Sequence, residues 1–311
     1  MPRLDPEPGK DVALATAVVD LLVLHEWVYD GPFVARVLRY GAEAGVRVAA
    51  AGPADLTPWL TAIRAGVRPG RVLDRASDVC PEAAALADAA KAAGVLVTND
   101  PDRARAAVDK ARMHLALMAS GVHVPHTVVL SPRRGVALDP ARLARLGRPF
   151  VLKPARGSGG EGVVLDATGP DDVKRARAAY PSDAILAQER IVWTALDGHP
   201  AYFRVFWCLG EIHACFWNPD TRRYTAVSRT QRAWNWHDGL ADVARAIARV
   251  AHMDLFSTEV AVTADGRFVS VDYVNDMCDL RMADEHPDGV PVAVVEAIAR
   301  RLVSASRGLR A

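Results

Sequence analysis

Short apolar runs alternate with amphipathic segments over the first third of the chain. Residues 17–25, 46–52, 71–77 and 95–99 are rich in aliphatic side chains, as buried strands are. The segments between them, 31–45, 55–66 and 81–94, have helical spacing and end on glycine, which often closes a helix. This alternation predicts a parallel sheet with helices on its faces.

The pattern changes after about residue 108. Helical stretches run to Gly121, and further helices are predicted near 170–180, over 237–253 and over 290–305. Residues 202–217 and 257–275 alternate around turns at 209–211 and 264–266, as antiparallel hairpins do. We therefore expect an α/β N-terminal domain followed by α+β domains with antiparallel sheets. The expected division is a flexible tail over 1–17, an N-terminal domain over 18–108, and two subdomains over 109–190 and 191–311.

Composition narrows the classes of function. The chain has 311 residues, 50% of them hydrophobic and 24% charged, with a net charge of +1, as in an ordinary globular protein. The charge balance disfavours a nucleic-acid partner, and no apolar run approaches the length of a membrane span. The four cysteines form no C-x-x-C pair, and the polar start is unlike a signal peptide. These features predict a cytoplasmic protein.

A glycine-rich stretch, VLKPARGSGGEGVVL, spans residues 151–165. Apolar runs enter and leave it, so it predicts strand–loop–strand rather than the strand–loop–helix of a dinucleotide site. Its Lys153 precedes the glycines, whereas a P-loop lysine follows them, and no kinase motif appears downstream. The two readings that stay open are a phosphate-binding glycine hairpin with a lysine at its base and an ordinary glycine turn.

Two further stretches suggest nucleotide and metal chemistry. The strand at 184–192 could offer backbone groups to an adenine, although it is equally compatible with a surface strand. Glu259 and Asp272 lie in the two arms of the 257–275 hairpin, with Asn275 close by. Two carboxylates and an amide on one face would form the all-oxygen site that Mg²⁺ prefers.

Arginines and tryptophans supply candidates for substrate binding, because guanidinium groups bind carboxylate or phosphate and aromatic rings line pockets. Arg204 and Arg281 are the preferred candidates. The polar segment 218–238 offers a second set, which a solvated basic loop would explain equally well: Arg229, Arg232 and Trp234.

The order of these features along the chain resembles the ATP-grasp superfamily, in the branch of glutathione synthetase and the RimK-like glutamate ligases. The resemblance covers almost the whole chain. Residues 72–77 and 94–130 are similar to that branch's entry domain and linker, and 150–163 to its phosphate-covering loop. Residues 185–191 are similar to its adenine hinge, and 257–275 to its metal hairpin.

The resemblance implies ATP and Mg²⁺ (or Mn²⁺) as cofactors. Carried over by position, the metal ligands are Glu259, Asp272 and Asn275, and Arg204 keeps the place of a family arginine. Arg204 and, from its residue type and its place after the acidic hairpin, Arg281 are the predicted catalytic arginines. Asp197 is the candidate ribose-binding acid, by position only. The remaining nucleotide-binding residues are Lys110, Lys153, Gly157, Ser158, Gly159, Gly160, Gln188, Glu189, Arg190 and Ile191.

Two positions depart from the family pattern. The family usually has Glu-x-Asn in the metal hairpin, whereas this chain has Asp272 and Asn275 three positions apart. The family's Asp-x-Arg is replaced by Tyr202-Phe203-Arg204, which removes an acidic residue. The second departure predicts a substrate different from those of the known glutamate ligases.

The expected function is therefore an ATP-grasp ligase that joins a small-molecule or peptide carboxylate to an amine, or less favourably to a thiol, through an acyl phosphate. A homodimer is compatible with this prediction. Two alternatives are a small-molecule kinase of the same fold and a nucleotide-binding module without catalysis. The joint presence of Lys153, Glu259 and Asp272 disfavours the second alternative, because an inactive module needs no metal ligands.

Overall fold

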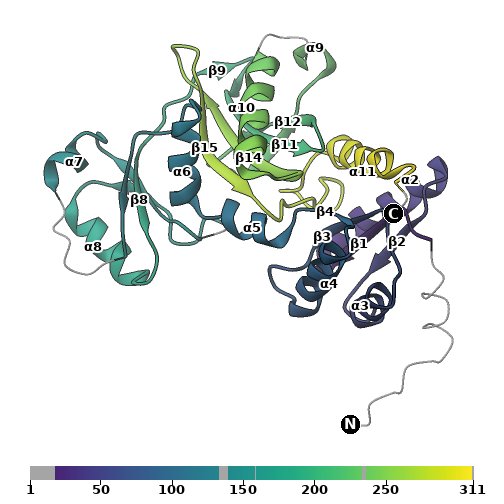
Figure 1. Cartoon of the computed structure of the whole chain (residues 1–311). Coiled ribbons are helices and arrows are strands. Elements are labelled where there is room, and N and C mark those ends of the chain that lie inside the picture. The colour runs from purple at the N-terminus through teal and green to yellow at the C-terminus, as the bar shows by residue number, and fades with distance from the viewer. Residues whose placement is uncertain (1–17, 133–138, 158, 233–235, 310–311) are drawn as a thin grey trace. The chain divides into compact units, whose positions relative to one another are not determined.

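The computed structural model describes residues 18–132, 139–157, 159–232 and 236–309 (Figure 1). The chain forms two compact units, and each is described by itself. The first unit joins Met1–Arg103 to Asp279–Ala311, and the second is Ala104–Cys278. The expected tail over residues 1–17 lies outside the described residues.

The first unit contains a four-stranded parallel sheet with the strand order β2-β1-β3-β4. This confirms the parallel sheet predicted from the alternating pattern. Its buried core combines the strands with one face each of α3 and α4. The strands are β1 (Leu21–His25), β2 (Val48–Ala51), β3 (Arg71–Arg75) and β4 (Leu96–Thr98), and the helices are α2 (Gly31–Ala44), α3 (Leu56–Arg64) and α4 (Pro81–Ala92), with a 3-10 turn η1 (Val28–Asp30).

The last helix, α11 (Val292–Ser306), belongs to this first unit and packs on α2 (Figure 1). Polar contacts accompany this packing. The Arg307 guanidinium donates to the carbonyl of Ala44 at 2.7 Å, and Arg39 contacts Glu296 at 3.3 Å. The sequence had placed residues 191–311 in one subdomain, but the contacts of α11 put the final segment with the start of the chain.

The second unit contains a four-stranded antiparallel sheet, β5-β8-β6-β7. Helices α7 and α8 accompany it, and side chains from both pack with the strands. The glycine-rich loop connects β6 to β7, as predicted from its flanking apolar runs. The strands are β5 (Thr127–Leu130), β6 (Phe150–Pro154), β7 (Val164–Ala167) and β8 (Ile185–Glu189), and the helices are α5 (Pro101–Ala107), α6 (Lys110–Ala119), α7 (Pro140–Ala144) and α8 (Pro170–Ala179).

A five-stranded antiparallel sheet, β13-β12-β11-β14-β15, completes the second unit. Both predicted hairpins are present, as β11–β12 and β14–β15, and α10 lies across one face (Figure 1). Four small elements, β9, β10, β13 and α9, were not predicted, because they are short and their segments lack a clear periodicity. The elements are β9 (Ala195–Leu196), β10 (His199–Pro200), β11 (Tyr202–Cys208), β12 (Glu211–Asn218), β13 (Arg223–Ala226), α9 (Arg229–Arg232), α10 (Trp236–Ala251), β14 (Leu255–Val262) and β15 (Phe268–Asn275).

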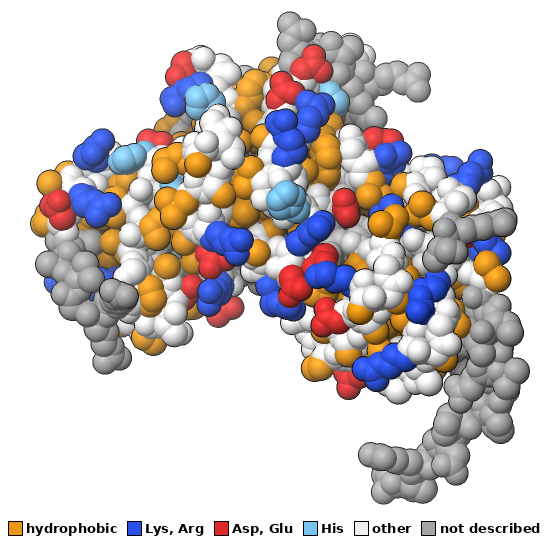
Figure 2. Space-filling view, in the orientation of Figure 1, with side chains coloured by type: hydrophobic (Ala, Val, Ile, Leu, Met, Phe, Trp, Pro, Cys, Tyr) orange, Lys and Arg blue, Asp and Glu red, His pale blue; other side chains and the backbone are white. Residues whose placement is uncertain are grey.

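The visible surface carries Lys, Arg, Asp and Glu side chains of both signs interspersed with one another (Figure 2). This distribution agrees with the net charge of +1. Within the described ranges, no helix combines the length and the hydropathy that crossing a bilayer requires.

The packing of α10 on the sheet depends on Gly239. A Cβ atom at this position would lie 2.4 Å from two ring carbons of Phe268 in β15. Gly239→Ala should therefore destabilise the protein by about 1–3 kcal/mol through overpacking. At a helix position with free space, the same substitution would instead stabilise the helix by ~1 kcal/mol, because alanine has the higher helix propensity. Gly31→Ala in α2 is the matched control, because nothing lies within 4 Å of its Cβ position. Thermal unfolding of both variants measures the contrast, and equal stability of the two would contradict this account of the packing.

Candidate active site

The candidate site lies on the face of the five-stranded sheet that α10 leaves uncovered. On the covered face, Phe203 and Val260 pack with Leu240 of α10. Because alternate residues of a strand point to opposite faces, Arg204 and Glu259 point away from that helix. The register sets Arg204 of β11 directly beside Glu259 of β14.

An irregularity in β15 brings Asp272 to the same face. Ser270 pairs with Val260, but Asp272 pairs with Glu259, so one extra residue, Val271, lies between the two pairs. In a regular strand, Asp272 would share the helix-covered face of Ser270. The bulge reverses its direction, as a shift of one residue must, and Asp272 joins the row of Arg204 and Glu259.

A second extra residue in β15 accounts for the unusual spacing of Asp272 and Asn275. The three residues of β14 from Ser257 to Glu259 face the four residues of β15 from Asp272 to Asn275. Residues three apart in a regular strand point to opposite faces, whereas here the Asn275 amide donates to Asp272 Oδ2 at 3.0 Å. The longer spacing in the sequence is thus offset by the bulge.

Both carboxylate oxygens of Glu259 are engaged by neighbours on β11. Arg204 Nη2 lies 2.5 Å from Oε1, and the Tyr202 hydroxyl donates to Oε2 at 2.6 Å. Arg204 also stacks over the ring of Trp217 at 5.2 Å. Burial and the adjacent Glu259 charge hold the pKa of Tyr202 well above its ordinary value, so its hydroxyl stays a donor at neutral pH.

Asp272 is the carboxylate with an oxygen atom that can accept a further contact. Its Oδ1 is buried and has no hydrogen-bond partner among the described atoms. Burial alone would raise the pKa of Asp272, but the charges of Lys110, Lys153 and Arg204, with the Asn275 hydrogen bond, outweigh burial and lower it. The group is therefore an anion at neutral pH with one oxygen available.

This donor set fits a hard divalent cation. Asp272 offers its unpartnered oxygen, and Glu259 and Asn275 lie beside it with further oxygens, the ligand type that Mg²⁺ takes. Within the described residues, no group of three or more His, Cys, Asp or Glu side chains is placed to hold a metal ion. A cation at this site would therefore need ligands besides the two carboxylates, such as the Asn275 amide and phosphate oxygens. The predicted grouping of Glu259, Asp272 and Asn275 is therefore present, as two carboxylates and one amide.

Lys153 ends in the same cluster from β6. Its side chain is 7% exposed, and its ammonium donates to the carbonyl of Val271, the bulged residue of β15, at 2.8 Å. It also lies over the ring of Tyr273 at 5.8 Å. Burial lowers the pKa of Lys153, while the Asp272 charge opposes that shift. A buried ammonium of this kind is stabilised by any anion that reaches it.

Lys110 approaches the glycine loop from the start of α6. Its backbone N–H donates to the carbonyl of Ala155 at 2.8 Å, and its ammonium donates to the carbonyl of Gly157 in a short hydrogen bond. The ammonium groups of the two predicted lysines thus reach different parts of the site. Lys110 contacts the glycine loop, and Lys153 contacts the bulge of β15. Ser158, also predicted to contact the nucleotide, lies outside the described residues.

The loop after Lys153 uses glycine where other residues would be strained. Gly159 and Gly160 have φ angles of 60° and 81°, which favour glycine. Gly162, at 71°, also packs so tightly that a Cβ would lie 2.5 Å from the Tyr180 hydroxyl. A Cβ on Gly160 would stand 3.4 Å from the guanidinium of Arg222, so the loop passes beside the β12–β13 turn.

The side chains at the predicted adenine hinge are already occupied. The amide of Gln188 donates to the hydroxyls of Thr127 and Tyr273, both at 2.9 Å, and Gln188 is 2% exposed. The carboxylate of Glu189 accepts from the backbone N–H of His126 at 2.7 Å. Any contact with a base would therefore come from the backbone of this segment, which continues into the exposed Arg190 and half-buried Ile191.

Asp197, the candidate ribose acid, lies in the turn between β9 and β10. It adopts a φ of 51° and accepts a hydrogen bond from the Gln231 amide at 2.5 Å. This contact ties the β9–β10 turn to α9. Arg229 and Arg232 begin and end α9, but their side chains lie outside what the structure describes, as does all of Trp234.

Arg281 lies in the first unit, whereas the other candidates belong to the second. Its guanidinium contacts Asp279 at 2.7 Å and Asp288 at 3.0 Å. Hydrogen bonds to Asp279 and Asp288 raise the pKa of Arg281. Two carboxylates thus already balance the charge that was predicted to bind substrate.

Two features of the site were missed in the sequence. Tyr202 lies two residues before Arg204, a spacing that places both on one strand face, and this period could have identified it. The second is a buried chain under Lys153, in which the Tyr273 hydroxyl accepts from Gln188 and lies 2.7 Å from His114 Nδ1. Burial, with the Lys153 charge, lowers the pKa of His114 to about 4, so its ring is neutral at neutral pH.

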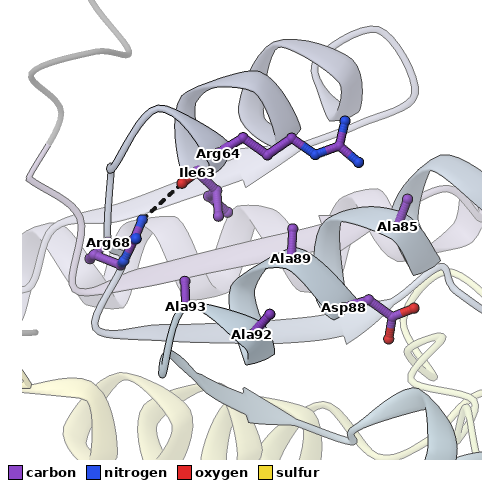
Figure 3. Close-up of a pocket in the computed structure, with 8 residues that line it drawn as sticks. All are labelled: Ile63, Arg64, Arg68, Ala85, Asp88, Ala89, Ala92 and Ala93. Carbon is purple, nitrogen blue, oxygen red and sulfur yellow. Dashed lines mark hydrogen bonds between the residues drawn. The ribbon is translucent and has the colours of Figure 1, made fainter.

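A surface pocket of about 610 Å³ lies elsewhere, between α3 and α4 of the first unit (Figure 3). Its wall is formed by alanines of α4 together with Arg64, Arg68 and Asp88, and Arg68 donates to the carbonyl of Ile63 at 2.8 Å. It holds none of the predicted site residues and gathers no set of groups suited to catalysis.

No protein-family model matches the chain, and neither does any curated protein sequence. Solved structures do match. The ATP-grasp ligase PsnB, complexed with precursor peptide PsnA2 and AMPPNP, is 14% identical with a TM-score of 0.63, over 94% of this chain and 99% of that one. A RimK domain protein from Sphaerobacter thermophilus DSM 20745 is 20% identical with a TM-score of 0.59, over 90% and 97%.

The D-cycloserine synthetase DcsG is a third match, 17% identical with a TM-score of 0.60, over 92% of this chain and all of that one. Matches of this coverage at such low identity concern the fold. They agree with the order of motifs read from the sequence, and the chain therefore has the ATP-grasp fold.

Proposed function

We propose that this protein is an ATP-dependent ligase that joins a carboxylate to an amine through an acyl phosphate, releasing ADP and phosphate. The observation that carries the proposal is the row of Arg204, Glu259 and Asp272 on one sheet face, with Lys153 at its end. The likeness to ATP-grasp ligases over more than nine-tenths of the chain supports it.

The charge of the cluster suits a polyphosphate. Lys110, Lys153 and Arg204 contribute three positive charges against two from Glu259 and Asp272, which leaves one positive charge. Asp272, with Asn275 and Glu259, would hold Mg²⁺, which when bound neutralises phosphate charge. Lys153, beside the β15 bulge, and Lys110, beside the glycine loop, would bind and orient phosphate oxygens, the electrostatic positioning on which phosphoryl transfer depends.

The chemistry that follows needs little from the protein beyond positioning. An oxygen of the substrate carboxylate attacks the γ-phosphorus, and the bond from that phosphorus to the bridging oxygen breaks to leave ADP. The amine then attacks the acyl carbon and expels phosphate. The substrates supply both nucleophiles, so the protein contributes orientation and charge. Arg204 is proposed to face the transferred group. Arg281 already pairs with two carboxylates, so the segment with Arg229, Arg232 and Trp234 is the second proposal for contact with the acid or amine.

The neighbours indicate two classes of acid to test first. PsnB was solved with a precursor peptide, and DcsG is a synthetase of a small molecule. Either a peptide carboxylate or a free small acid is therefore a reasonable substrate to examine for this chain.

A hydroxylamine trap tests the proposed intermediate. Hydroxylamine converts an acyl phosphate to a hydroxamate, so a panel of peptide and small-molecule acids with Mg-ATP should yield ADP and hydroxamate in equal amounts for the true substrate. A kinase that phosphorylates a hydroxyl group would give ADP without hydroxamate, and that result across the panel would reject the ligase proposal.

Nucleotide binding gives a test that needs no substrate. Mg-ATP at about 100 times its Kd should stabilise the folded protein by roughly 2.7 kcal/mol, because the ligand binds only the native state. The melting temperature should rise accordingly, and less so with EDTA present. An unchanged melting temperature at millimolar Mg-ATP, roughly the upper end of usual KM values, would count against an ATP site.

Isosteric substitutions test the two central residues. Lys153→Met and Asp272→Asn should each lower ADP formation by about 10²–10³-fold, the usual loss when a charge-stabilising group is removed. Lys174→Met and Asp265→Asn, at exposed ion pairs, are matched controls and should keep activity. Lys153→Met also removes the hydrogen bond to Val271 and a charge that balances Asp272, so the melting temperature should fall as well, and turnover is compared at a temperature where the variant is folded. Near-native turnover in either variant would remove that residue from the site.

A further inference from the structure

The Tyr202 hydroxyl has only one evident role, which is to hold Glu259. Tyr202 is 4% exposed, and its ring meets the edge of Trp193 at a centroid distance of 5.0 Å. The hydroxyl donates to Glu259 Oε2 at 2.6 Å, within the range of a charge-assisted hydrogen bond. A rigid buried ring thus fixes one oxygen of a flexible carboxylate side chain.

Glu259 needs such support because of its place in the sheet. Arg204 holds Oε1, and without a second contact the carboxylate could rotate about its last bond toward the guanidinium. With both oxygens fixed, the carboxylate stays beside Asp272, its partner in the register and the group with the unpartnered Oδ1. Groups that orient a metal ligand typically contribute a factor of about 10–100 to metal affinity.

We propose that Tyr202 is a positioning residue of the cation site, which acts by fixing Glu259 beside Asp272. This inference rests on the proposed function, because it takes the cluster as a divalent-cation site. Tyr202 would thereby raise the affinity of the site for the cation, with or without nucleotide, and takes part in no chemical step.

The test measures Mn²⁺ binding to the full chain in the presence of ADP, from the loss of the free Mn²⁺ signal in electron paramagnetic resonance. Tyr202→Phe removes only the hydroxyl and should weaken Mn²⁺ binding about tenfold with little change in melting temperature. Tyr40→Phe is the control, because it deletes a hydroxyl that contacts Arg39 in the first unit. That control should bind Mn²⁺ as the parent protein does.

A double-mutant cycle separates this role from a general structural one. If Tyr202 acts through Glu259, Tyr202→Phe should have no further effect on Mn²⁺ affinity in a Glu259→Gln background. Equal weakening in both backgrounds, or unchanged affinity in the single variant, overturns the proposal. Trp193→Leu leaves the hydroxyl but removes the ring that packs against Tyr202, so it should also weaken Mn²⁺ binding. If Tyr202→Phe does not fold, unchanged Mn²⁺ affinity in Trp193→Leu overturns the proposal.

Failure of the underlying function gives a different result. If the parent protein binds neither Mn²⁺ nor ADP, the cation site itself is rejected. If the parent protein binds both and Tyr202→Phe binds them equally well, only the role of Tyr202 is rejected.

Discussion

Burial of charge is the constraint on which the rest of the site depends. Lys153 is 7% exposed, and the side chains of Arg204 and Glu259 are 13% and 16% exposed. Each such group, left unpaired, would cost several kcal/mol of desolvation. The antiparallel register lowers this cost by placing Arg204, Glu259 and Asp272 side by side across three strands. Each charged group therefore lies near a group of opposite charge.

Much of the fold could be predicted because periodicity reports directly on burial. The parallel sheet and both hairpins follow from it, whereas the order of lysines, glycine loop and acidic hairpin was read from the motifs themselves and from their resemblance to the ATP-grasp superfamily. The bulges in β15 could not be predicted, because a strand that gains one residue has the same composition as a regular one. Those bulges decide the direction of Asp272 and Asn275, so the spacing of these residues looked irregular in the sequence while their side chains meet in space.

Other differences between the predicted and the observed contacts arise where one residue type can serve either a ligand or the fold. The amide of Gln188 suited an adenine contact, yet in the folded unit it donates to Thr127 and Tyr273. Arg281 suited a substrate carboxylate, yet it has carboxylates of its own in Asp279 and Asp288. Long-range partners choose between such roles, and they are set by packing that lies beyond local sequence.

The return of α11 to α2 has a consequence for how the protein is made. The first unit is assembled from the beginning and the end of the chain, with residues 104–278 inserted between them. Its β-strands are synthesised before residues 104–278, and α11, which packs on α2, is synthesised after them. The contact between α2 and α11 can therefore form only after the whole second unit has been synthesised, so completion of the first unit depends on a segment that residues 104–278 separate from its sheet.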